Sequence, residues 1–382
     1  MNMKKSTLLA AAAVLLLASC GKNEVYVPVQ EDIPVGFSNY APRSITKADN
    51  GAVDTGSLPT GAKIGVYGYS TATDNLATAF TTKPEFMTDA VVDYGSNTSA
   101  TATATNPVRY WPKTNTNLLS FFAYYPQEST RISGKPTAST AGMGTFTFTQ
   151  AGAVEDMEDF MISNVANDQY YWATGESENA NGVKATNGVV PLTFNHMLTK
   201  VNFKFRTVQD YSSKGVTIKV KSAKILANGV YKDVVITPSY TAVAAGSEGN
   251  TAFARTSNTN MYDADVTIPF SADQTLNTTA TLNNGTAKTQ TDFLFVPQVL
   301  SDDAKVSITY TIEQENAPTE EITATVQLNL INKDGSDPAA PIDEWHINEF
   351  ITYTFNIGLR EILFTGSANT WAIVTNGTYV IQ

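Results

Sequence analysis

Apolar and polar residues alternate with a period of two in short runs along most of this chain. Such alternation places every second side chain on the same face of a β-strand, so that one face is buried and the other meets water. The run VNFKFR directs Val201, Phe203 and Phe205 to one face, and Asn202, Lys204 and Arg206 to the other. The same style recurs in KIGVYGY, LLSFFAYY, TFTFTQ, VTIKVK, KVSITYTI and ITATVQLNL, the last of which ends at Leu330 on the apolar face. The pattern predicts half-buried strands of antiparallel sheets.

The order of these runs predicts an all-β protein with two sandwiches in tandem. After the first nineteen residues, no long segment carries the apolar stripe of an amphipathic helix. The clearest break is GESENANGVKATNG, residues 175–188, which is polar, lacks periodicity and separates two strand-rich halves. We therefore expect an N-terminal sandwich over residues 44–187 and a C-terminal sandwich over residues 188–382. A long hairpin loop inside one domain would give the same pattern.

The start of the chain reads as a signal peptide over residues 1–19. Lys4 and Lys5 precede a short apolar run, and small residues follow it. The only cysteine, Cys20, ends the sequence Leu-Ala-Ser-Cys, which resembles the lipobox of bacterial lipoproteins. That resemblance implies cleavage before Cys20, acylation of its thiol and its amine, and anchoring to the outer membrane. The alternative is a small buried cysteine.

Composition excludes a nucleic-acid partner. The formal net charge is −11, and it becomes −13 when the two lysines of residues 1–19 are removed. A chain of this charge has no basic footprint for phosphates. No run after the signal peptide is long and apolar enough to cross a membrane as a helix.

The sequence also argues against an enzyme. The two histidines, His196 and His346, lie in strand-like contexts that favour structural roles. The acidic pairs Glu155-Asp156, Glu158-Asp159 and Glu320-Glu321 are typical of a solvated surface. No nucleophile elbow, zinc-protease motif or phosphate loop is present, and NKDGSD lacks the spacing of a calcium loop. We expect no catalytic residue, no cofactor and no metal.

Several stretches of the chain stand out in order: IPVGFSNYAPRSITKA, GAKIGVYGY, VRYWPKTNTNLLSFFAYYP, EDFMIS, LTFNHMLTKVNFKF and EWHINEFITYTFNIGL. Taken together, they resemble the fimbrillins, the subunits of type V pili. The resemblance spans nearly the whole chain after the signal peptide. It implies two transthyretin-like β-sandwich domains and a structural subunit of a cell-surface fimbria that supports adhesion. Its partners would be other pilin subunits, the outer membrane through the lipid, and a processing protease.

The resemblance further implies that a removable first strand lies within residues 20–43. Ile33, Val35 and Phe37 alternate on one face of that candidate strand. Fimbrillins are cut after a basic residue just beyond this strand; Arg43 is the matching position, with Lys47 as a substitute. Cutting would open a groove that another subunit fills by strand exchange. A solvated loop arginine is the alternative for Arg43.

The C-terminal sequence TWAIVTNGTYVIQ is the candidate donor of the replacing strand. Its Asn-Gly pair between two apolar runs predicts a type I′ hairpin. The candidate donor side chains are Trp371, Ile373, Val374, Tyr379 and Ile381. An ordinary hairpin that completes the second domain is equally compatible with this sequence.

A second reading is a surface-retained lipoprotein that binds glycans, or that anchors or caps a pilus without polymerising. Tyr170, Tyr171 and Trp172 form an aromatic cluster that could stack on a sugar, although core packing explains such clusters as well. The sequence leaves the choice among stalk, tip and anchor open, and does not identify the adhesion target.

Overall fold

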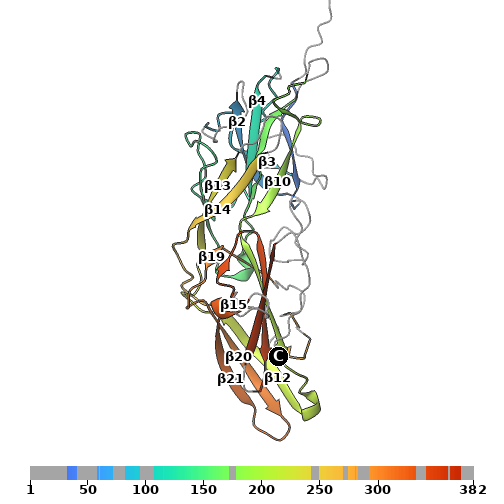
Figure 1. Ribbon diagram of the computed structural model, residues 1–382, viewed down its shortest axis with the longest axis vertical. Helices are drawn as coiled ribbons and strands as arrows, with labels where there is room; N and C mark the ends of the chain where they lie inside the picture. The colour runs from blue at the N-terminus through green and yellow to red at the C-terminus, as the bar shows by residue number, and fades with distance from the viewer. Residues whose placement is uncertain are drawn as a thin grey trace, which may run out of the picture. The chain divides into compact units, whose positions relative to one another are not determined.

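A computed structural model describes residues 32–40, 58–59, 61–71, 82–94, 107–114, 116–171, 178–241, 249–269, 274–279, 281–282, 292–332, 341–359 and 362–370. These residues form β-strands and three short 3-10 helices, so the predicted all-β class is confirmed. The 3-10 helices are η1 (Val154–Asp156), η2 (Ser212–Lys214) and η3 (Leu328–Leu330). Figure 1 shows the strands, with β12, β20 and β21 side by side and β13 beside β14.

The largest sheet has the strand order β1-β10-β7-β4-β2-β3, with β8 pairing β4 and β9. Its strands are β1 (Gly36–Tyr40), β10 (Val189–His196), β7 (Met161–Ser163), β4 (Leu118–Tyr125), β2 (Lys63–Thr71), β3 (Met87–Asp93), β8 (Ala166–Tyr170) and β9 (Val183–Lys184). The central strand β4 is buried along both faces except at its last residue. This explains why its sequence is a continuous apolar run.

A four-stranded sheet in the order β14-β13-β6-β5 faces the first sheet. It contains β5 (Ile132–Ser133), β6 (Phe146–Thr149), β13 (Asp233–Thr241) and β14 (Asn250–Ser257). Aromatic rings of β4 pack against this sheet: the ring centroids of Tyr124 in β4 and Phe146 in β6 lie 5.4 Å apart. The pairing of β6 with β13 joins segments that are far apart in the sequence.

The remaining strands form two five-stranded sheets and one small ribbon. The first five-stranded sheet holds β11 (Thr199–Thr207), β17 (Thr281–Leu282), β18 (Asp292–Phe295), β23 (Glu349–Ile357) and β24 (Ile362–Thr370). The second holds β12 (Val216–Ile225), β15 (Val266–Ile268), β16 (Gln274–Thr275), β20 (Lys305–Gln314) and β21 (Glu320–Gln327). The ribbon pairs β19 (Gln298–Val299) with β22 (Glu344–Trp345).

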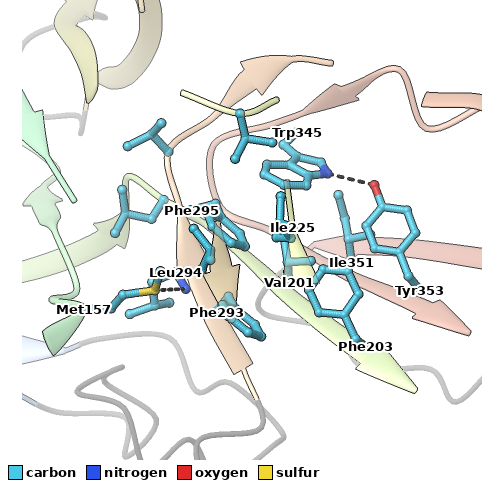
Figure 2. Close-up of a cluster of buried hydrophobic side chains, with 14 of the residues drawn as sticks. Met157, Val201, Phe203, Ile225, Phe293, Leu294, Phe295, Trp345, Ile351 and Tyr353 are labelled. Carbon is cyan, nitrogen blue, oxygen red and sulfur yellow. Dashed lines mark hydrogen bonds between the residues drawn. The ribbon is translucent and has the colours of Figure 1, made fainter. Parts of the chain in front are cut away.

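An aromatic core lies between these sheets (Figure 2). Phe203 of β11 stacks on Tyr353 of β23 with centroids 5.7 Å apart, and Ile225 of β12 belongs to the same buried cluster. The Trp345 indole donates a hydrogen bond of 2.8 Å to the Tyr353 hydroxyl. The inward alternation predicted for Val201, Phe203 and Phe205 is confirmed, since all three are buried.

Strand pairing crosses the predicted domain boundary between residues 187 and 188 in two places. The strand β10 follows that boundary but pairs with β1 and β7, which precede it. The strand β13 pairs with β6 across the same boundary. A polar break in a sequence indicates an exposed segment, but it carries no information about which strands pair with each other. The division into two tandem sandwiches therefore stays a prediction.

Two predictions of side-chain direction are wrong. Asn202 was expected to face water, yet it is buried, because its side chain donates a hydrogen bond of 2.6 Å to Asp292 on the adjacent strand β18. Leu330 was expected inside, yet it is 58% exposed. The strand β21 ends at Gln327, and η3 then changes the direction of the chain and of its side chains.

Asp233 ties the start of β13 to the loop that follows β14. Its carboxylate accepts hydrogen bonds from the backbone N–H groups of Thr259 at 2.7 Å and Asn260 at 2.9 Å, and from both of their side chains. Burial raises the pKa of Asp233, but these hydrogen bonds outweigh burial and leave the pKa below its ordinary value. The carboxylate therefore stabilises the folded protein only while it is ionised.

We expect Asp233→Asn to lower the free energy of unfolding by about 2–3 kcal/mol at neutral pH, since an amide N–H would face the same donors. The folded pKa lies below the unfolded value of about 3.9, so this difference should shrink as pH falls through the folded pKa. Urea unfolding at about pH 7 and pH 3 measures it. Asp263→Asn, at a side chain that is 92% exposed, is the control. A difference that stayed constant with pH would refute the assignment.

Candidate functional site

The strand β1 is the first strand of the described chain and lies at an edge of its sheet. It runs parallel to β10, with Gly36 opposite Val189 and Asn39 opposite Leu192. Parallel pairing is slightly weaker per residue than antiparallel pairing. Because β1 is terminal in the strand order, it can leave without breaking any other pair of the sheet.

The inward side chains of this strand are deeply buried. Val35 and Phe37 are 0% exposed, as their alternation predicts, and Ile33 is half-buried. The Phe37 ring meets the Phe121 ring of β4 edge-on, with centroids 5.2 Å apart. The same apolar cluster contains Val190 and other side chains of β10 and β2. Full burial of an apolar side chain is worth about 1.5–3 kcal/mol, so Val35 and Phe37 together contribute roughly 3–6 kcal/mol to holding the strand.

A second backbone segment flanks the start of the strand on its other side. The Val35 N–H donates to the Arg109 carbonyl at 2.8 Å, and the Trp111 N–H donates to the Ile33 carbonyl at 2.9 Å. Pro34 sits opposite Tyr110 between these two bonds, where its missing N–H leaves no donor unpaired in this pairing. We call the β10 edge, the segment 109–111 and the side chains beneath β1 the first-strand seat.

The Trp111 side chain joins the two sides of the first-strand seat. Its indole Nε1 donates to the Gly188 carbonyl at 3.0 Å, and the same carbonyl accepts the Gly36 N–H at 3.0 Å. The indole is 5% exposed, and its ring lies 6.2 Å from that of Phe121. The indole therefore belongs to the buried floor on which the strand rests.

A tight turn aims the Gly188 carbonyl. Asn187 and Gly188 both have positive φ, at 53° and 74°, and the Val189 N–H donates to the Thr186 carbonyl. Positive φ at both central residues is the geometry of a type I′ turn, for which Asn-Gly is the preferred pair. A Cβ at position 188 would lie 3.0 Å from Ile33 Cγ2, and the positive φ would strain any other residue, so glycine is favoured there.

The far end of the strand is held by a buried amide. Asn39 is 7% exposed, and its Oδ1 accepts the Leu58 N–H at 2.7 Å. Leu58 follows the predicted processing positions in sequence, so this bond joins the strand to chain beyond them. Burial raises the pKa of the nearby Tyr94, which keeps its phenol neutral. The floor of the seat is thus apolar, and backbone donors and acceptors lie along its edges, which suits a peptide strand.

Several sequence-predicted site residues lie outside the described part of the chain. They are Cys20, Arg43, Lys47, Trp172, Trp371, Ile373, Val374, Tyr379 and Ile381. The described strand β24 pairs with β23 along its length and ends at Thr370, directly before the candidate donor segment. The roles assigned to these residues stay predictions.

The aromatic cluster proposed for glycans is only partly available. Tyr170 is 4% exposed and packs against Leu118, so its ring cannot stack on a sugar. Tyr171 is half-buried, and its ring centroid lies 6.3 Å from that of Trp111. Core packing therefore accounts for Tyr170 and links Tyr171 to the first-strand seat.

Two of the polar residues considered for catalysis, Asp159 and His346, differ in burial or secondary structure from what the sequence predicts. Asp159 is buried rather than solvated, and its Oδ2 lies 2.9 Å from Nδ1 of the buried His196. His346 lies outside any strand, and its side chain is 54% exposed. Within the described ranges, no group of three or more His, Cys, Asp or Glu side chains could hold a metal ion. The described residues include no helix with the length and apolarity needed for a membrane span.

The alternation in the sequence predicted the burial of Val35 and Phe37, but sequence reasoning missed the residues that surround their strand. Trp111 and Gly188 carry no alternation signal, and they are 77 residues apart. The available clue is the Asn-Gly pair at 187–188, which favours a type I′ turn but lies in the polar stretch that we interpret as a domain boundary.

The chain is similar to a known protein family and to several solved structures. The family model described as fimbrillin-like matches residues 46–371. A fimbrial protein from Bacteroides vulgatus superimposes with a TM-score of 0.57 at 17% identity, covering 88% of this chain and 99% of that one. A fimbrilin from Porphyromonas gingivalis gives a TM-score of 0.41 at 11% identity, with 91% and 99% covered. A C-terminally truncated tip fimbrial protein from the same species gives 0.38 at 9%, with 88% and 100% covered. No curated protein matches.

Proposed function

The chain belongs to the fimbrillin-like family, and from this premise we propose that it is a structural subunit of a cell-surface fimbria that assembles by strand exchange. In this proposal the first strand occupies its seat only before assembly. A protease then removes it, and a strand of another subunit takes its place.

One observation carries the proposal: a strand with two fully buried apolar side chains stands at the edge of its sheet and is held there by non-covalent contacts. Val35 and Phe37 anchor the strand, and the strand pairs with β10 and with segment 109–111. Its loss would expose an apolar floor and an unpaired edge of β10. An exposed sheet edge is a template for an added strand.

The proposed assembly route begins at the membrane. The signal peptide would be removed and Cys20 acylated, so that the precursor is held at the outer membrane by lipid. Cleavage after Arg43, or after Lys47, would separate the first strand and its lipid from the rest of the chain. The lipid anchor and the strand are thus lost together, which couples release from the membrane to opening of the seat.

The proposed donor is the C-terminal segment of another subunit. The strand β24 ends at Thr370, and the sequence beyond it continues with two short apolar runs on either side of Asn376-Gly377. An incoming strand that refills the two buried positions would regain roughly 3–6 kcal/mol from side chains before its backbone hydrogen bonds are counted. Ordering of the segment opposes part of this gain.

We expect the double substitution Arg43→Ala/Lys47→Ala to abolish filament assembly, because the strand would stay covalently attached in its seat. The measurement is the amount of protein in filaments sheared from cells of the native host, together with its electrophoretic mass. Lys214→Ala is the matched control, since Lys214 is exposed and far in sequence from the seat.

Normal filaments from the double variant would contradict processing at these positions. Retention of the acylated N-terminus in all wild-type protein would instead favour an anchor, a cap or a glycan-binding lipoprotein.

A further inference from the structure

The Trp111–Gly188 hydrogen bond differs from the other bonds at the seat in one respect. The Val35 and Gly36 N–H donors and the Ile33 carbonyl acceptor all belong to the first strand. Their hydrogen bonds are therefore lost when that strand leaves. The bond from Trp111 Nε1 to the Gly188 carbonyl is made entirely by chain that remains. It connects the segment on one side of the strand to the turn on the other.

We propose that Trp111 is a positioning residue for strand exchange. In the empty first-strand seat it keeps the two walls, segment 109–111 on one side and the turn at Gly188 on the other, separated by the width of one strand. The inference rests on the proposed function and adds a preorganised acceptor to it. The partner that it fits is an extended strand of apolar side chains alternating with small or polar ones.

The geometry gives the reason. Arg109 and Trp111 present a carbonyl and an N–H toward the strand, and Gly188 presents a carbonyl from the opposite side. If these walls closed on each other after strand loss, an incoming strand would have to separate them again. The indole prevents closure because it is buried on the floor, against Phe121, and is fixed at its polar end. Preorganisation of this kind reduces the ordering cost of binding.

The turn at Asn187-Gly188 makes the second wall rigid. Its type I′ geometry is set locally by the sequence, and the missing side chain at 188 leaves room for both Ile33 and the indole. When the strand leaves, the Gly188 carbonyl loses the Gly36 N–H but keeps the indole. The turn therefore keeps its orientation in the open state.

The test separates stability of the closed precursor from binding to the open seat. The mature chains of the wild type and of each variant are cut with an arginine-specific protease, and the first strand is displaced in mild urea. The rate at which a labelled synthetic peptide of residues 32–40 associates with each cut chain is then measured. Trp111→Phe is compared with Trp345→Phe, which also removes one buried indole hydrogen bond, to Tyr353 in a different core. We expect the two variants to lose similar stability as uncut precursors. We expect Trp111→Phe alone to slow peptide association, by roughly tenfold, the effect of about 1.4 kcal/mol in the barrier.

Equal association rates for Trp111→Phe and Trp345→Phe would overturn the inference. If wild-type protein failed to release its strand or to bind the peptide at all, the proposed function itself would be wrong. Should Trp111→Phe not fold, benzothienylalanine at position 111 replaces the indole N–H with sulfur and keeps the ring shape. Slower association in that variant supports the inference, and an unchanged rate refutes it.

Discussion

Replacing Phe37 with alanine is expected to destabilise the unprocessed protein by about 3–5 kcal/mol, the cost of removing a fully buried aromatic ring. The ring is 0% exposed and packs edge-on against Phe121, so its loss leaves a cavity that the surrounding strands cannot readily close. The effect should appear only before assembly. In assembled filaments the first strand is absent under the proposed mechanism, and Phe37→Ala filaments should match wild type in stability.

This contrast is measured by denaturant unfolding of the precursor and by the temperature at which filaments dissociate. Ser38→Ala, on the opposite face of the same strand, is the control and should leave the precursor nearly unchanged. If Phe37→Ala weakened filaments as much as precursor, the strand would be retained after assembly and the exchange mechanism would fail.

Lys200→Met is expected to lower the free energy of unfolding by about 3–5 kcal/mol, because it removes one partner of a buried ion pair. Lys200 Nζ lies 2.9 Å from Asp292 Oδ2, and both side chains are 0% exposed. The other oxygen of Asp292 accepts the Asn202 side chain at 2.6 Å. Without the lysine, a carboxylate would be left in the interior with its cation gone.

The double variant Lys200→Met/Asp292→Asn provides the internal comparison. An asparagine at 292 keeps an oxygen for Asn202 and removes the buried charge, so most of the lost stability should return. Urea unfolding of the two single variants and the double variant gives the coupling between the residues. Additive losses would show that the two side chains do not depend on each other.

The sequence predicted which faces of the strands are buried, because period-two alternation is a local property. Val35, Phe37, Val201 and Phe203 all lie inside as that pattern requires. Partners are a non-local property, so the alternation said nothing about which strands meet. The parallel pairing of β1 with β10, across about 150 residues, could not be read from either segment alone.

The wrong predictions for Asn202 and Asp159 have the same physical origin. Asn202 was assigned to the solvent face by its polarity, but β18 brings Asp292 directly opposite it and supplies the hydrogen bond that burial demands. Asp159 was assigned to a solvated pair, yet His196 lies beside it in the interior. A polar side chain can be buried wherever a distant strand supplies its partner. Trp111 was missed as a wall of the seat for the same reason, since its acceptor is the distant Gly188 carbonyl.

The central claim is that the first strand is removed when the subunit assembles, and the N-terminus of assembled protein tests it most directly. Filaments sheared from the cell surface and protein extracted from the membrane fraction would each be analysed by mass spectrometry of the N-terminal peptide. The account predicts that filament protein begins at Ser44 or Ala48, whereas membrane protein begins at acylated Cys20. Filament protein that still carried residues 20–43 would contradict the account.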